Sequence, residues 1–148
     1  MKRRLAMVIL PIAILMTGCS ALGDVSDSLA YVDEATGYVD DVNQFAEELP
    51  ALAETAIHDL DAQVQLEELL VEMQDKAEQF NVLESPVMLE DIHNQLLELN
   101  EGLTTKIDLY LENIESGTLT ESLLSETGLL EEVSVYTGLL EQLDKFGE

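Results

Sequence analysis

Cysteine, tryptophan and basic residues are scarce in this chain of 148 residues. It has one Cys, no Trp, and six Lys or Arg against 31 Asp or Glu, which gives a formal net charge of −25. A single Cys excludes an internal disulfide and a zinc cluster built on cysteines. The excess negative charge repels phosphate backbones and anionic headgroups, so we expect neither nucleic-acid binding nor a basic membrane-surface helix.

Proline is also rare, and no alternating strand pattern of useful length occurs. The three prolines are Pro11, Pro50 and Pro86, so long uninterrupted helices are allowed over most of the chain. The sequence contains no Gly-x-Ser-x-Gly turn and no glycine-rich phosphate loop. A raised-pKa carboxylic acid requires a dry cleft with aromatic walls, and aromatic residues are only 5% of the chain. We therefore expect a protein that is not an enzyme.

The first 18 residues have the features of a secretory signal. Basic residues at positions 2–4 precede an apolar stretch from Leu5 to Leu15. A membrane span takes about 20 apolar residues, so this shorter stretch predicts a removable signal and not a transmembrane helix. In an ordinary secretory signal Cys19 would be a coincidental thiol. However, the only Cys of the chain stands where a lipoprotein signal requires it.

The sequence Met16-Thr17-Gly18-Cys19 resembles the bacterial lipobox. The resemblance implies cleavage before Cys19 and a thioether-linked diacylglycerol, with acyl chains such as palmitate, on that residue. Two acyl chains, at about 0.8 kcal/mol per buried CH₂, hold a soluble domain on a membrane without further help. We expect residues 1–18 as the signal peptide, 19–23 as the lipidated N-terminus with a short tether, and 24–148 as an acidic helical domain.

Apolar residues recur every three or four positions from Val25 to Leu49, which predicts an amphipathic helix. Tyr31, Tyr38 and Phe45 form a column on its apolar face. If the column is buried in the core, it contributes packing and implies no function. If it is left uncovered, it forms an exposed groove for a partner helix.

Three further helices follow from the same spacing. We expect the second to begin at Pro50 and to be interrupted near residues 58–61, where Asp59 or Asp61 caps a restart. The third begins with Ser85 as N-cap and Pro86 as first helical residue, and it ends at Ser116-Gly117. After a short turn near residues 120–126, the last runs from about Leu129 to Phe146. Its predicted apolar face consists of Leu130, Val133, Tyr136, Leu140 and Leu143.

These elements predict an all-α fold, an antiparallel bundle of three to four amphipathic helices after the lipoprotein signal peptide. A coiled-coil-like oligomer is the alternative. Repulsion between the many acids opposes either fold, because only three lysines remain after the signal. The consistent apolar faces nevertheless indicate that the chain folds.

Histidine and carboxylate patterns give weak metal signals. Glu90-Asp91-Ile92-His93 is a Glu-x-x-His, half of the motif used by di-iron bundles, but no second copy occurs. We therefore interpret His93 as a solvated or interfacial side chain and assign no catalytic, cofactor or metal residue. The first predicted helix carries a ladder of acids that would condense divalent cations loosely: Asp33, Glu34, Asp40, Asp41, Glu47 and Glu48.

Several stretches together resemble a family of small lipoproteins from spore-forming Gram-positive bacteria of the Bacillaceae type, catalogued as a domain of unknown function. They are Gly18-Cys19 and residues 28–36, 48–54, 90–95 and 111–117. None of them is a chemical motif. The resemblance implies a helical lipoprotein outside the cytoplasmic membrane and brings no catalytic residue.

The sequence as a whole favours a lipid-anchored, non-enzymatic protein on the outer face of the cytoplasmic membrane, held there through Cys19. It would act as a protein-interaction or envelope-associated module, and its acidic surface favours a basic partner or a cation-bridged approach to anionic lipid or wall polymer. A low-affinity divalent-cation-binding surface protein is the alternative. Calorimetric titration with Ca²⁺ separates the two, because several weak sites with a structural response favour cation binding.

The charge imbalance predicts that added salt stabilises the fold. Raising the NaCl concentration, or adding millimolar Mg²⁺ or Ca²⁺, screens the repulsion between carboxylates, so the melting temperature measured by circular dichroism should rise. A melting temperature that does not respond to ionic strength or divalent cations would contradict this expectation.

Overall fold

The computed structural model describes residues 20–147, and every regular element in that range is helical. The elements are α1 (Ser20–Ala56), α2 (Leu60–Asn81), the 3₁₀ turn η1 (Val87–Leu89), α3 (Glu90–Ser116), α4 (Leu123–Thr127) and α5 (Leu129–Gly147). The predicted all-α antiparallel bundle is confirmed. The predicted signal peptide and Cys19 lie outside the described residues, and α1 already includes residues 20–23 of the predicted tether.

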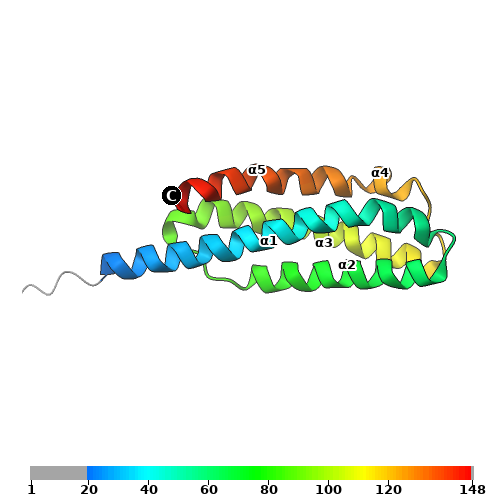
Figure 1. Ribbon diagram of the computed structural model, residues 1–148, viewed down its shortest axis with the longest axis horizontal. Helices are drawn as coiled ribbons and strands as arrows, with labels where there is room; N and C mark the ends of the chain where they lie inside the picture. Colours follow the sequence, from blue (N-terminus) through cyan, green and yellow to red (C-terminus); the bar gives the residue numbers. More distant parts are fainter. Residues whose placement is uncertain (1–19, 148) are drawn as a thin grey trace, which may run out of the picture.

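The four long helices lie side by side and alternate in direction (Figure 1). Helix α1 packs against α2 and α5, and α3 packs against the same two helices, so α1 and α3 lie on one diagonal of the bundle. One end of the bundle contains the start of α1, the α2–α3 connection and the end of α5 (Figure 1). The opposite end contains the α1–α2 turn and α4.

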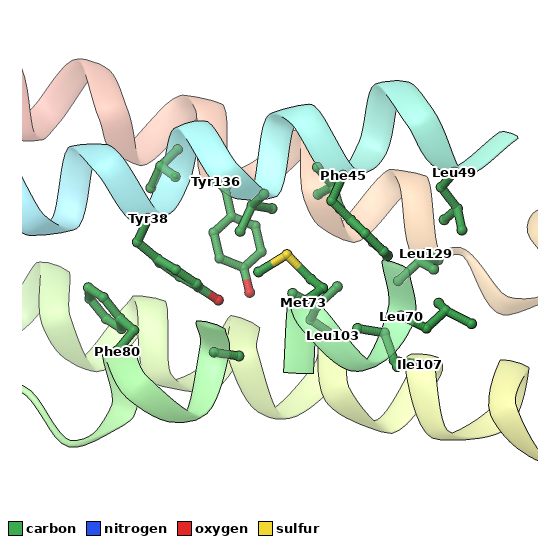
Figure 2. Packing of buried hydrophobic residues seen from close by; sticks show 14 of the residues in the cluster. Tyr38, Phe45, Leu49, Leu70, Met73, Phe80, Leu103, Ile107, Leu129 and Tyr136 are labelled. Carbon is green, nitrogen blue, oxygen red and sulfur yellow. The ribbon is translucent and has the colours of Figure 1, made fainter. Parts of the chain in front are cut away.

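The apolar stripes of the four helices meet in one continuous core. Figure 2 shows residues of all four long helices pointing into this interior. Tyr31, Tyr38 and Phe45 are exposed by only 3%, 6% and 3%. The aromatic column of α1 is therefore core packing, and this face of α1 provides no open groove.

Helix α1 continues through Pro50, so the prediction that the second helix begins there is wrong. Proline removes one intrahelical hydrogen bond and costs a helix interior about 3 kcal/mol. Leu49, Ala53 and Ala56 continue the buried stripe of α1 past this point. Their burial keeps the chain helical until the true connection at residues 57–59.

The predicted restart is confirmed at Asp59. Its side chain accepts hydrogen bonds from the backbone N–H groups of Asp61 and Ala62, at 2.8 and 3.0 Å. Because Asp59 satisfies these otherwise unpaired donors, α2 begins at Leu60.

Two other local predictions need correction. Pro86, not Ser85, is the N-cap of the η1 turn, without a side-chain cap, and α3 proper begins at Glu90. In α5 the buried face includes Leu129 and Leu139, whereas Leu130 is 37% exposed. The predicted end of α3 is confirmed, since Gly117 adopts φ 69°, and Gly128 adopts φ 63° before α5.

Gly102 in α3 faces the side chain of Glu132 of α5. A Cβ atom at this position would collide with the carboxylate of Glu132, which forms a salt bridge with Lys106 of α3. Both charged side chains are partly buried, 25% and 21% exposed. The glycine therefore leaves room for an ion pair that joins α3 to α5.

Replacing two helical glycines by alanine should have different effects. Gly37→Ala should raise the free energy of unfolding by roughly 0.5–1 kcal/mol, because nothing lies within 4 Å of the new Cβ. Gly102→Ala should gain less or destabilise, since it displaces Glu132 from Lys106. Urea unfolding measures both. When Gly102→Ala is made in the Glu132→Ala variant, it should raise the free energy of unfolding of that variant as Gly37→Ala does for the wild type. Equal increases from Gly37→Ala and Gly102→Ala in the wild type would contradict this explanation.

Candidate functional site

The bundle interior contains a polar cluster centred on Asn100, which is fully buried in α3. Its Oδ1 accepts hydrogen bonds from the hydroxyls of Tyr38 (2.6 Å) and Tyr136 (2.8 Å). Its Nδ2 donates to Oδ1 of Asn81 at 2.7 Å. The four side chains come from α1, α5, α3 and α2, so one carboxamide joins all four long helices. Figure 2 shows the Tyr38 and Tyr136 hydroxyls inside the bundle.

A second buried pair lies closer to the end where α1 begins. The Tyr31 hydroxyl and Nδ1 of His93 are hydrogen-bonded at 2.9 Å. Phe80 of α2 packs between the two polar groups: its ring stacks on Tyr38 with centroids 4.6 Å apart and lies 5.6 Å from the His93 ring. This arrangement connects the two polar groups into one aromatic layer.

His93 was predicted to be solvated or interfacial, and that prediction is wrong. The side chain is only 8% exposed, and burial lowers its pKa. Its partner in the proposed half-motif, Glu90, is exposed. Among residues 20–147 no group of three or more His, Cys, Asp or Glu side chains is arranged to hold a metal ion.

The tyrosines of the polar cluster are neutral groups that are hydrogen-bonded inside the bundle. Burial raises the pKa of Tyr31 to about 12, and it also raises the pKa values of Tyr38 and Tyr136. These hydroxyls stay protonated at neutral pH and their hydrogen bonds are made within the bundle. Such groups are neither activated nucleophiles nor bases open to a substrate.

The carboxylate ladder of α1 faces outward. Five of its six acids are exposed, and the sixth, Asp41, forms a 3.0 Å salt bridge with Lys76 of α2. Lys76 also pairs with Glu72 at 3.1 Å, and these partners raise the pKa of the lysine, led by the hydrogen bond that Lys76 donates to Asp41. Lys76 thus joins the acidic faces of α1 and α2.

Two groups of exposed apolar side chains in the described part of the chain were not identified from the sequence. The first, the α2 ridge, consists of Leu60, Val64 and Val71, which are 78%, 54% and 42% exposed. Their spacing of four and seven residues puts them on one face, opposite the buried stripe of α2. The sequence did contain a signal for this surface, because these three residues do not fit the three-or-four-residue spacing of the buried residues of α2. The second surface lies on the α2–α3 connection, at Val82, Val87 and Met88.

Exposed acids lie between and beyond the apolar residues of the α2 ridge. Glu67 and Glu68 stand between Val64 and Val71 in the sequence, and Asp75 and Glu78 follow Val71; all four are exposed. The surface therefore combines apolar contact area with strong negative charge. No helix in the described part of the chain is long and apolar enough to cross a membrane.

Comparison with known proteins agrees with the resemblance found in the sequence. The family of unknown function DUF6376 matches residues 31–146. The uncharacterized lipoprotein YybP of Bacillus subtilis (strain 168) is 37% identical over 131 residues, which cover 88% of this chain and 88% of that protein. No solved structure matches the chain. The predicted similarity to a family of uncharacterised Bacillus lipoproteins is thus confirmed.

The burial of His93 predicts a specific pH dependence of stability. Because its pKa is lowered in the folded protein, the unfolded chain binds the proton more readily below about pH 6.5. The stability that neutral His93 contributes is therefore complete above that pH and is lost as the pH falls.

Urea unfolding at pH 7.5 and pH 5.0 measures this contribution as the difference between wild type and His93→Gln. The difference in free energy of unfolding, wild type minus His93→Gln, should be smaller at pH 5.0 than at pH 7.5. Protonation of carboxylates affects both proteins alike and cancels in this difference. His58→Gln changes an exposed histidine and is the matched control. A difference that stays constant or grows at pH 5.0 would contradict the prediction.

Proposed function

Since the chain belongs to the DUF6376 family and is similar to a lipoprotein, we propose that it is a lipid-anchored protein that acts through protein contacts outside the cytoplasmic membrane. Cys19 carries the diacylglycerol, and the helical bundle is displayed in the space between membrane and wall. It binds another protein and catalyses no reaction.

The α2 ridge is the observation that carries this proposal. Three large apolar side chains point away from the core on a strongly acidic helix. A partner with an apolar seam and basic flanks would bury Leu60, Val64 and Val71 while pairing with the neighbouring acids. A basic amphipathic helix has this chemistry, and it would align along α2.

The polar interior supports a non-enzymatic role. Tyr31, Tyr38, Tyr136 and His93 are the buried groups with shifted pKa values in the central cluster, and each is engaged inside the bundle. Their shifts follow from burial in a packed core. The same groups, placed in an open cleft, would have been candidates for acid–base chemistry.

Cation binding by the α1 ladder is the weaker candidate. Asp41 is already neutralised by Lys76, and the other ladder acids are exposed to solvent. Exposed single carboxylates hold divalent cations only loosely, because Ca²⁺ takes six to eight oxygen ligands.

Site-specific photo-cross-linking tests the proposed partner surface. A photoreactive amino acid is placed at Val71, on the α2 ridge, or at Val135, a 50% exposed position on α5, in cells that express the full chain. We expect Val71 to give a discrete cross-linked protein band that weakens with added salt, since the contact is partly electrostatic. The same label from Val135 would contradict the assignment of the surface.

The control Cys19→Ser separates the anchor from the contact. This variant should leave the membrane fraction, and its cross-link at Val71 should fall because the partner is no longer held at the same surface. A Cys19→Ser protein that stays in the membrane fraction would contradict the lipid anchor.

A further inference from the structure

The end of the bundle where α1 begins is the end nearest the predicted lipid. Ser20, the first residue of α1, directly follows Cys19 in the sequence. The α2–α3 connection lies at this same end (Figure 1). A bilayer that holds Cys19 therefore faces this connection and not the α1–α2 turn.

The connection exposes three apolar side chains although its other apolar residues are covered. Val82, Val87 and Met88 are 80%, 89% and 62% exposed. Leu89 is fully buried, and Leu83 packs partly against the core. The backbone N–H of Leu89 donates to the Pro86 carbonyl at 2.9 Å, which closes the η1 turn. The exposed residues are thus presented by a fixed connection.

The connection is also attached to α1. The hydroxyl of Ser28 donates to Sδ of Met88 at 3.2 Å, and a surface hollow lies between residues 27–28 and residues 85–88. From Ser20 to Ser28, α1 rises about 12 Å at 1.5 Å per residue. The polar interface of each leaflet is roughly 5–7 Å deep. An upright bundle would hold Met88 just above the headgroups, and a tilted bundle brings it into them.

We propose that Val82, Val87 and Met88 form a second contact with the lipid bilayer, beside the anchor, and so hold the bundle at a tilt to the membrane. This inference depends on the proposed lipid anchor. The anchor makes a weak contact sufficient, because a tethered surface meets the bilayer at a high effective concentration. Each apolar side chain that enters the interface removes its surface from water.

The neighbouring charges define the kind of lipid. Asp27, Glu84, Glu90 and Asp91 are exposed around the connection. They are repelled by anionic headgroups, so the contact is strongest on zwitterionic lipid and weakens on anionic lipid at low salt.

Tryptophan fluorescence tests this contact directly, because the chain has no Trp of its own. Lipidated full-length Val87→Trp is reconstituted in phosphatidylcholine vesicles with and without brominated acyl chains. We expect a blue-shifted emission that the brominated lipid quenches. Val64→Trp, on the α2 ridge, is the matched exposed control and should keep its emission.

Further variants separate the possible failures. Adding Val82→Asp and Met88→Asp to Val87→Trp should abolish quenching while the protein still floats with the vesicles. If Val87→Trp floats but is not quenched, the second contact is wrong and the anchor stands. Equal quenching of Val64→Trp would also overturn the inference, because the bundle would then lie flat. If lipid-processed protein does not float at all, the proposed anchor itself fails.

Discussion

The carboxamide of Asn100 is the polar centre of the bundle, and its hydrogen bonds involve side chains from the other three long helices. A buried carboxamide without partners would cost about 1–3 kcal/mol for each unsatisfied group. Apolar stripes alone pack in several registers, because leucine contacts are similar after a shift by one turn. Only one register brings Tyr38, Tyr136 and Asn81 to Asn100 together. The polar cluster therefore favours a single alignment of the four helices.

The separation of acidic and apolar side chains explains how so acidic a chain supports one defined structure. The acids lie on the outside, where water and counterions screen them, and the interior is filled by apolar and aromatic side chains. Lys76 and Lys106 each bridge two helices, at the α1–α2 and α3–α5 contacts. Ion pairs that remain partly open to solvent contribute little individually, so we attribute the stability chiefly to the core. The acidic exterior is then available for recognition.

Two apolar surfaces distinguish one end of the bundle from its side. The α2 ridge lies along the side of the molecule, whereas the apolar connection lies at the end where α1 begins. In the proposed arrangement the end contacts lipid and a side contacts a partner. Both surfaces are made by residues that the core does not use, which is why they can serve contacts without weakening the fold.

Much of α3 was readable from spacing. Apart from Ile92, its buried residues follow the buried Leu89 of η1 in alternating steps of four and three: His93, Leu96, Asn100, Leu103, Ile107, Tyr110 and Ile114. His93 and Asn100 occupy core positions of this spacing although they are polar, so the spacing of apolar residues alone misplaced His93 and did not identify Asn100. The wrong prediction that a helix begins at Pro50 has a related origin. Proline is common at the first position of a helix, but here the burial of Leu49 and Ala53 keeps α1 continuous through it.

The sequence by itself determined that the chain is helical, where its apolar and acidic faces lie, that a cap stands at Asp59 or Asp61, and the resemblance to lipoproteins. These properties depend on neighbours within one or two helical turns, so the order of residues contains them. The tertiary structure decided that Tyr31 meets His93 and that Tyr38 meets Asn100, in each case 62 residues apart. It also decided which apolar residues stay exposed. Such pairings depend on how whole helices align, and that alignment follows from packing and hydrogen bonding across the bundle, not from local spacing.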